Sequence, residues 1–136
     1  MADAKISQLT AVTTLDGTEP LPVVQSSTTK KATVSQILTG QLVTESGTTR
    51  TLSATDNGKI IYCTSSSAVT INCAAGLGVG FNCTIIQGGT GKVTVAANSQ
   101  TLVSYSSLFS TMGQYAVISL VCPVANTFIA AGNLGV

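Results

Sequence analysis

The sequence predicts an all-β protein: a small antiparallel β-sandwich or barrel of the jelly-roll type, preceded by an extended N-terminal arm with a short helix. Two observations support this prediction. Between residues 51 and 97, short runs rich in Val, Ile and Thr alternate with Gly, Asn and Asp, and these residues favour pleated strands and tight turns respectively. The turns recur about every ten residues, which indicates short strands in a sandwich or barrel rather than a helical domain.

The chain of 136 residues has room for one domain and an arm. We expect residues 1–50 to form an N-terminal attachment segment with a hairpin and a short helix. Residues 51–136 are expected to form the β-sandwich or barrel, which also serves for oligomerisation.

Charged side chains are scarce and unevenly placed. They make up 8% of the residues, and beyond Lys59 the only one is Lys92. A monomer normally needs a charged surface to stay soluble, so this region is expected to be covered by copies of itself or by a larger assembly. The alternative is a surface made polar by Ser, Thr and Asn. The net charge of +1 gives no reason to expect a nucleic acid or an anionic membrane as partner.

Residues 1–24 have the pattern of an extended arm. Pro20 and Pro22 fix φ and remove backbone donors, which favours an extended path through residues 21–24. The arm is dotted with apolar residues but has too few of them for a core of its own. We expect it to become ordered on a partner surface, the alternative being an ordinary N-terminal strand that packs on its own domain.

Residues 25–43 have the features of a hairpin or a short helix. The polar stretch 25–29 is a turn, and Lys30 and Lys31 follow it as solvated residues or as contacts to acidic groups of a partner protein. Thr33 and Gln36 have the spacing of a capping box for a helix over residues 33–38, which Gly40 would end. Residues 44–50 are expected to link this segment to the β domain.

The β domain has a sequence of apolar runs separated by turn residues. The Gly-rich stretch 88–91 is interpreted as a hairpin turn. The strongest strand is expected over residues 114–122; residues 123–126 then form a turn, which returns the chain to the last strand, 127–131. The short apolar tail 132–136 is suited to an interface. The other expected strands are 60–63, 69–73, 81–87 and 93–95.

The four cysteines are Cys63, Cys73, Cys83 and Cys122. Zinc sites usually contain a pair of cysteines separated by two to four residues, a spacing that is missing here. Each cysteine lies in or at the end of a strand-like run, and a free cysteine behaves as a small hydrophobic residue. We therefore expect buried thiols that serve packing, with a disulfide and a metal site as alternatives.

The chain lacks the residue types of an active site. It contains no His, and its last carboxylate side chain is Asp56, whereas acid–base catalysis needs a His or a tuned pair of carboxylates. Gly88–Lys92 does not have the spacing of a phosphate-binding loop. We therefore predict no enzyme activity, cofactor, metal or small-molecule substrate. The apolar runs are too short to span a membrane, and the N-terminus does not have the pattern of a signal peptide.

Several stretches of the chain resemble a known family. In the β domain they are Asp56–Lys59, Ala68–Ile71, Gly76–Phe81 and Ile85–Gly91. They are similar to the β module of tailed-bacteriophage virion proteins, which include capsid decorations, fibres and baseplate components. The segment that often precedes this module is resembled by Lys5–Leu9, Leu15–Glu19 and Pro22–Gln25 through Lys30–Thr33.

The resemblance implies a virion structural protein made in the cytoplasm of a bacterial host. We expect a capsid decoration (cement) protein on the outer shell that stabilises the virion as a homotrimer and binds the major capsid protein or another virion protein. The alternative is a tail-fibre or baseplate component that recognises a host surface glycan. Capsid contact is assigned to Ile6, Leu9, Leu15, Leu21, Val23 and Lys30. Self-association is assigned to Phe128, Ile129, Leu134 and Val136.

Overall fold

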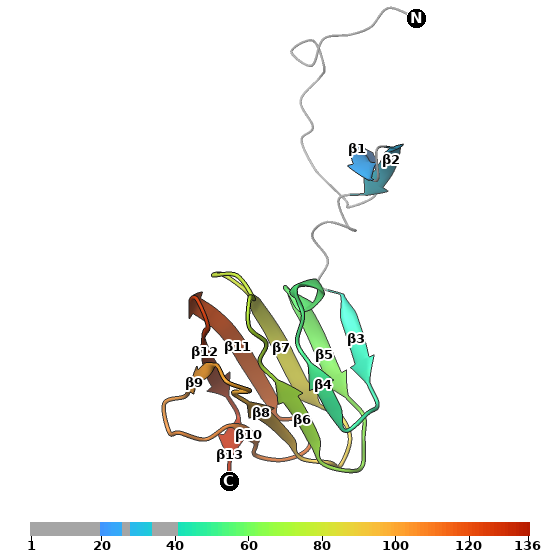
Figure 1. The fold of residues 1–136 in the computed structure, drawn as a ribbon. Helices are drawn as coiled ribbons and strands as arrows, with labels where there is room; N and C mark the ends of the chain where they lie inside the picture. Colours follow the sequence, from blue (N-terminus) through green and yellow to red (C-terminus); the bar gives the residue numbers. More distant parts are fainter. Residues whose placement is uncertain (1–19, 26–27, 34–40) are drawn as a thin grey trace, which may run out of the picture. The chain divides into compact units, whose positions relative to one another are not determined.

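The computed structural model describes residues 20–25, 28–33 and 41–136. The chain divides into two compact units, Met1–Thr39 and Gly40–Val136. In the first unit, strands β1 (Pro20–Gln25) and β2 (Thr28–Thr33) pair as an antiparallel hairpin (Figure 1). It begins earlier than the hairpin expected within residues 25–43, because its first strand lies in the stretch expected to be an extended arm. The expected helix over residues 33–38 falls, beyond Thr33, outside the described residues.

The second unit is a β-solenoid of about three turns. Its chain passes alternately between two sheets that face each other, and successive turns pair in parallel (Figure 1). One sheet receives β3 (Leu42–Glu45), β5 (Lys59–Cys63) and β7 (Asn82–Gln87). The other receives β4 (Thr49–Thr51), β6 (Val69–Asn72) and β8 (Val93–Ala96). A short 3₁₀ turn, η2 (Ala54–Asp56), precedes β5.

The C-terminal strands complete both sheets. The first becomes six-stranded, in the order β3-β5-β7-β11-β12-β9. The second becomes five-stranded, in the order β13-β10-β8-β6-β4. The added strands are β9 (Thr101–Val103), β10 (Ser110–Thr111), β11 (Val117–Val124), β12 (Thr127–Gly132) and β13 (Leu134–Gly135). Since β11 runs antiparallel to β7 and β10 antiparallel to β8, the parallel coiling stops after the third turn.

The prediction of an antiparallel, jelly-roll-like sandwich is therefore wrong. The expected strands exist, but from β3 to β8 the turns between them are corners at which the chain changes sheet, not hairpins. The Gly88–Gly91 stretch illustrates the error, because it joins β7 of the six-stranded sheet to β8 of the five-stranded sheet. The ten-residue rhythm thus reflects two strands per solenoid turn.

The glycines of the β7–β8 corner allow it to lie against the preceding corner, which joins β5 to β6. A Cβ at Gly89 or Gly91 would collide with the backbone carbonyls of Ser65 and Ser67, which lie between β5 and β6. Only residues without a Cβ allow two backbones to approach so closely. These glycines therefore serve the stacking of one turn on the next.

The core lies between the two sheets and is built from their inward-facing residues. Ile61, Ile85 and Ile118 pair directly across β5, β7 and β11, and each is fully buried. The buried rings of Phe81 and Phe128 belong to the same core and meet edge to face, with their centroids 6.4 Å apart. The strict alternation of buried and exposed positions along the strands matches a sheet with one face on the core.

The first solenoid turn begins earlier in the chain than the sequence indicates. Residues 44–50, expected to be a linker, contain the end of β3 and the start of β4. Thr51, the first residue of the expected β domain, is the last residue of β4. At the other end, the expected pairing of β11 with β12 is confirmed, but the turn is shorter than the expected 123–126, because β11 continues through Pro123 to Val124. Pro123 lies where the register of this hairpin shifts between Val121 and Val124, as is common for a strand proline.

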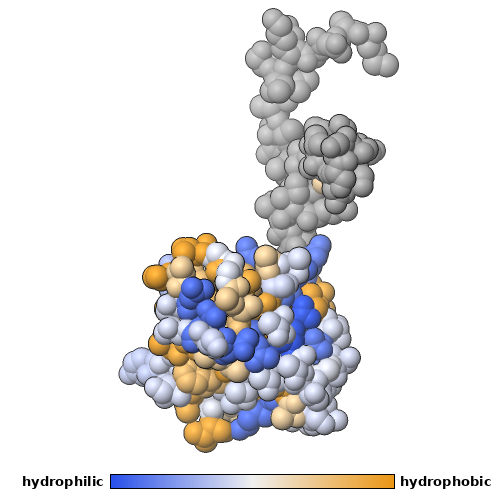
Figure 2. All heavy atoms as spheres, viewed as in Figure 1, coloured by the Kyte–Doolittle hydropathy of each residue, from blue (hydrophilic) through white to orange (hydrophobic). Residues whose placement is uncertain are grey.

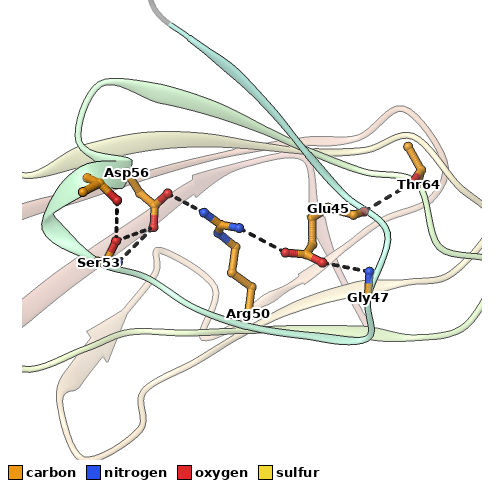
Figure 3. A network of polar contacts seen from close by, with 7 residues as sticks. Glu45, Gly47, Arg50, Ser53, Asp56 and Thr64 are labelled. Carbon is orange, nitrogen blue, oxygen red and sulfur yellow. Dashed lines mark hydrogen bonds and ion pairs between the residues drawn. The ribbon is translucent and has the colours of Figure 1, made fainter.

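Charged residues close the core at the first turn. Arg50 of β4 pairs with Ile71 of β6, which pairs in turn with Val95 of β8. Arg50 therefore occupies an inward position that is apolar in the next two turns. It donates to Glu45 at 3.1 Å and to Asp56 at 2.6 Å (Figure 3). Asp56 also accepts from the backbone N–H of Ser53 at 2.9 Å. The network therefore acts as a polar cap, which the end of a solenoid requires.

Candidate functional site

The outer face of the six-stranded sheet is unusually apolar. Along each of its strands, the residues that alternate with the core residues point outward, and none of these outward positions carries a charge. We call the eight large apolar residues among them the apolar face. They are Leu42, Ile60, Tyr62, Ile86, Val103, Val117, Val121 and Ile129.

The strand register places six of these residues in two rows, between which the polar residues Thr84 and Ser119 pair across β7 and β11. Tyr62, Ile86 and Val117 are direct neighbours across β5, β7 and β11. Val121, Ile129 and Val103 are direct neighbours across β11, β12 and β9. The second row is the more accessible, with Val103 43% exposed and Val121 and Ile129 each 38% exposed. Apolar rows of this kind are suited to packing against another sheet.

The outer face of the five-stranded sheet has a different character. Its outward positions carry small polar or small side chains. They are Thr49, Thr51, Thr70, Asn72, Thr94, Ala96 and Ser110. The hydroxyls of Thr94 and Ser110 bond each other at 2.9 Å. The two outer faces therefore differ, and the apolar one is the candidate for an interface.

A hollow lies at the margin of the apolar face. Its volume is about 260 Å³, and it is lined by residues of β12, β13 and the loop after β9, among them Tyr105, Ile129 and Leu134. The side chain of Tyr105 is fully exposed beside it. In Figure 2, apolar residues are also visible near the β11–β12 turn, where Val124 is 61% exposed, and around the C-terminus, where Val136 is 96% exposed.

The residues expected to mediate self-association do not all lie at the surface. Ile129 belongs to the apolar face, Leu134 lines the hollow and Val136 is exposed. Phe128 is fully buried against Phe81, so it has no surface to offer a second copy and acts in the core instead. Phe128 was assigned with the rest of the last strand and the tail, but neighbours on a strand such as Phe128 and Ile129 point to opposite faces.

The residues expected to contact the capsid fall in the first unit. The backbones of Leu21 and Val23 lie in β1 and that of Lys30 in β2, where Val23 pairs with Lys30. The remaining three, Ile6, Leu9 and Leu15, lie outside the described residues.

The cysteines are all buried and unpaired with one another, which confirms the expectation of free thiols in the core. Burial raises the pKa of Cys63 and of Cys73 to about 11, and that of Cys83 to about 12. A thiol with such a pKa carries almost no thiolate at neutral pH, so it is a poor nucleophile and a poor metal ligand.

Two further findings concern only the part of the chain that the structure describes. Over residues 20–25, 28–33 and 41–136, no three His, Cys, Asp or Glu side chains gather closely enough to hold a metal ion. Within the same ranges, no helix has the length and apolarity needed to cross a membrane.

Comparison with known proteins gives no match to any family model or any curated protein sequence. The case for a function therefore depends on the chain's own surface.

The sequence analysis missed most of the apolar face. Only Ile129 was assigned, although Leu42, Tyr62 and Val121 share the same side of the sheet. The alternation within each run shows which residues share one side of a strand. Assembly of these sides into one uncharged face requires the pairing of β3, β5, β7 and β11, which the sequence does not reveal.

Proposed function

We propose that this protein is a capsid decoration (cement) protein of a tailed-bacteriophage virion, made in the host cytoplasm and carried on the outer shell. In this proposal, copies associate through the apolar face as a homotrimer, and the N-terminal unit attaches the assembly to the major capsid protein or another virion protein. The observation that carries the proposal is the uncharged apolar face on one side of the solenoid.

The chemistry of the apolar face supports association of identical copies. When an uncharged face meets the same face of a second copy, no like charges repel each other. A charged group there would lose its hydration in the contact, which costs free energy. The row of Val103, Ile129 and Val121 offers β-branched side chains, which fit between those of a facing sheet. Closed symmetric assemblies are the usual outcome when one surface meets another copy of the same chain.

The division into two units supports the attachment role. Residues 1–39 form a separate compact unit, so the solenoid is able to associate while the N-terminal unit binds elsewhere. A trimer presents three N-terminal units, and several weak contacts to the shell then combine into stable attachment through their high effective concentration. Such an assembly stabilises a shell because opening it would break all of these contacts.

The test is a count of copies in purified virions, combined with the mass of the free protein in solution. Copy numbers comparable to those of the capsid subunits, with a trimeric mass, support the proposal. A few copies confined to the tail would overturn the capsid location and favour a tail-fibre or baseplate component. A monomeric mass would overturn the role of the apolar face.

The second candidate is the tail-fibre or baseplate component that recognises a host surface glycan. One observation favours it. Two aromatic side chains are available to a ligand, since Tyr105 is fully exposed and Tyr115 is 70% exposed.

A further inference from the structure

A second hollow shares no lining residue with the hollow beside Ile129. It is shallow, with a volume of about 310 Å³, and is formed by residues 112–116, which connect β10 to β11, together with Asn133. Its two large side chains, Met112 and Tyr115, are each 70% exposed. The lining contains no charged residue.

Tyr115 is held in a backbone conformation that side chains rarely adopt. Its φ is +67°, in the left-handed region, where a bulky residue costs about 1–3 kcal/mol and persists only if its surroundings enforce it. The enforcing bonds are present. The N–H of Tyr115 donates to Gln87 at 2.7 Å, and the N–H of Ala116 donates to Gly113 at 3.1 Å. The Gln114 side chain is tied to the Gly88 carbonyl at 2.8 Å.

The support beneath this loop is a buried polar contact. Thr111 is fully buried, and its hydroxyl donates to the Gln87 side chain and accepts from the N–H of Val93 at 2.9 Å. Gln87 itself is 2% exposed, and its N–H donates to the Ala116 carbonyl at 3.1 Å. The backbone that carries the exposed Tyr115 ring is therefore held in place by hydrogen bonds. Less conformational entropy is then lost when a ligand binds to the ring.

The polar groups around the ring match the hydroxyls of a sugar. Gln114 uses its Nε2 atom in the bond to Gly88, which leaves its carbonyl oxygen as an acceptor. Asn133 uses its Oδ1 atom to accept from Val117 at 3.4 Å, which leaves its amide group as a donor. Tyr115, whose ring has an apolar body, lines the same hollow as both amides, and a few placed polar groups around apolar surface are typical of small-ligand sites.

We propose that this hollow, the Tyr115 site, binds a neutral saccharide. One face of a sugar ring packs on Tyr115, and its hydroxyls bond the side-chain amides of Gln114 and Asn133. The lining has no cation to attract a carboxylate or sulfate, so acidic sugars gain nothing over neutral ones. The proposal goes beyond the capsid role and rests on the observation behind the second candidate function, since it assigns a ligand class and a site to the exposed Tyr115.

The hollow beside Ile129 provides a contrast. It also has an exposed tyrosine, Tyr105, but its lining includes apolar residues of the β12–β13 region and only one polar side chain, that of Ser106. Tyr105 therefore offers a ring without amide groups on either side. It serves as the matched control for Tyr115.

The test is binding of the full-length protein to an array of neutral and acidic oligosaccharides, followed by titration of the best neutral one. The variants are Tyr115→Asn and Tyr105→Asn. Asn tolerates the left-handed region better than Tyr, so we expect Tyr115→Asn to unfold at the same temperature as the wild type or higher. It should nevertheless bind the sugar at least tenfold more weakly, while Tyr105→Asn binds it normally.

Three results would overturn the proposal: no neutral oligosaccharide is retained, only acidic ones are retained, or Tyr115→Asn binds as tightly as the wild type. None of them changes the copy number or the solution mass, so failure of the saccharide site is distinguishable from failure of the capsid role.

Discussion

The guanidinium of Arg50 lies 2.6 Å from the carboxylate of Asp56, and this ion pair closes the first turn of the solenoid. The Asp56 side chain is 1% exposed and that of Arg50 is 23% exposed. Burial alone would raise the pKa of Asp56, but hydrogen bonds from Arg50 and Ser53 outweigh it and hold the pKa below its ordinary value of 3.8. The pair is thus favourable only while Asp56 is ionised.

The first prediction is that acid destabilises the protein through Asp56. Because the folded-state pKa is depressed, the stabilisation is fully present above the unfolded-state value and is lost as the pH falls below about 4. Asp56→Asn should lower the free energy of unfolding at pH 7 and reduce its dependence on pH below 4. Breaking a buried pair costs about 3–5 kcal/mol, and we expect the lower end because Arg50 is partly exposed. Urea unfolding at several pH values measures both effects.

Glu45→Gln is the matched control for this prediction. Glu45 contacts the same guanidinium at 3.1 Å but has a 16% exposed side chain, and more exposed pairs contribute less. An equal loss in the two variants would show that burial does not set the strength of the Asp56 pair.

The second prediction concerns the stacking of corners. Gly91→Ala places a Cβ against the carbonyl of Ser67, so two solenoid turns must separate locally. We expect a loss of about 1–3 kcal/mol, as for other overpacked sites. Gly78→Ala is the control, since a Cβ there meets nothing within 4 Å, and it should change stability by less than about 0.5 kcal/mol. Equal urea midpoints for the two variants would contradict the close contact.

These glycines show where the sequence is informative about the fold and where it is not. The alternation around Ile85 predicts a strand with one buried face, and the structure has one. Parallel and antiparallel strands with one buried face share that alternation, so it does not reveal that Ile85 pairs in parallel with Ile61. Gly89 and Gly91 also look the same in a hairpin as in a corner, because glycine suits both a turn and a close backbone approach.

The candidate sites depend even more on the pairing of strands. Scarcity of charge in the second half of the chain predicts a covered surface, but not which one. Val121, Ile129 and Val103 become neighbours only once β9 joins β12 in parallel. Tyr115 falls within a run that the sequence assigns to a strand, and its left-handed backbone depends on the long-range bond to Gln87.

The third prediction is that the thiols are protected in the folded protein. Cys63, Cys73 and Cys83 combine full burial with a raised pKa. A thiol reagent at pH 8 should therefore label none of the four cysteines rapidly under native conditions and all four in denaturant. Rapid labelling of one cysteine in the native protein would show that its strand opens locally.

The fourth prediction tests the apolar face. Ile129→Lys should dissociate the assembly, because each copy would bring a cation into an uncharged contact and desolvate it there. Light scattering after size-exclusion chromatography gives the mass. Thr70→Lys places the same cation at the centre of the opposite outer face, and we expect it to leave the assembly intact. Dissociation by Thr70→Lys alone would assign the contact to the threonine-lined face instead.

The last prediction separates attachment from assembly. Deletion of residues 1–39 removes the whole first unit and leaves the solenoid, in which the strands from β3 onward pair with one another over the described residues. Since the core residues that the structure describes all belong to the second unit, we expect the truncated protein to keep its strand content, its cooperative unfolding and its oligomeric mass. It should fail to bind virions that lack the protein, whereas Ile129→Lys should bind them weakly as a monomer. If the truncated protein unfolds, residues 1–39 stabilise the solenoid rather than attach it, and binding that survives the deletion would place the attachment surface on the solenoid itself.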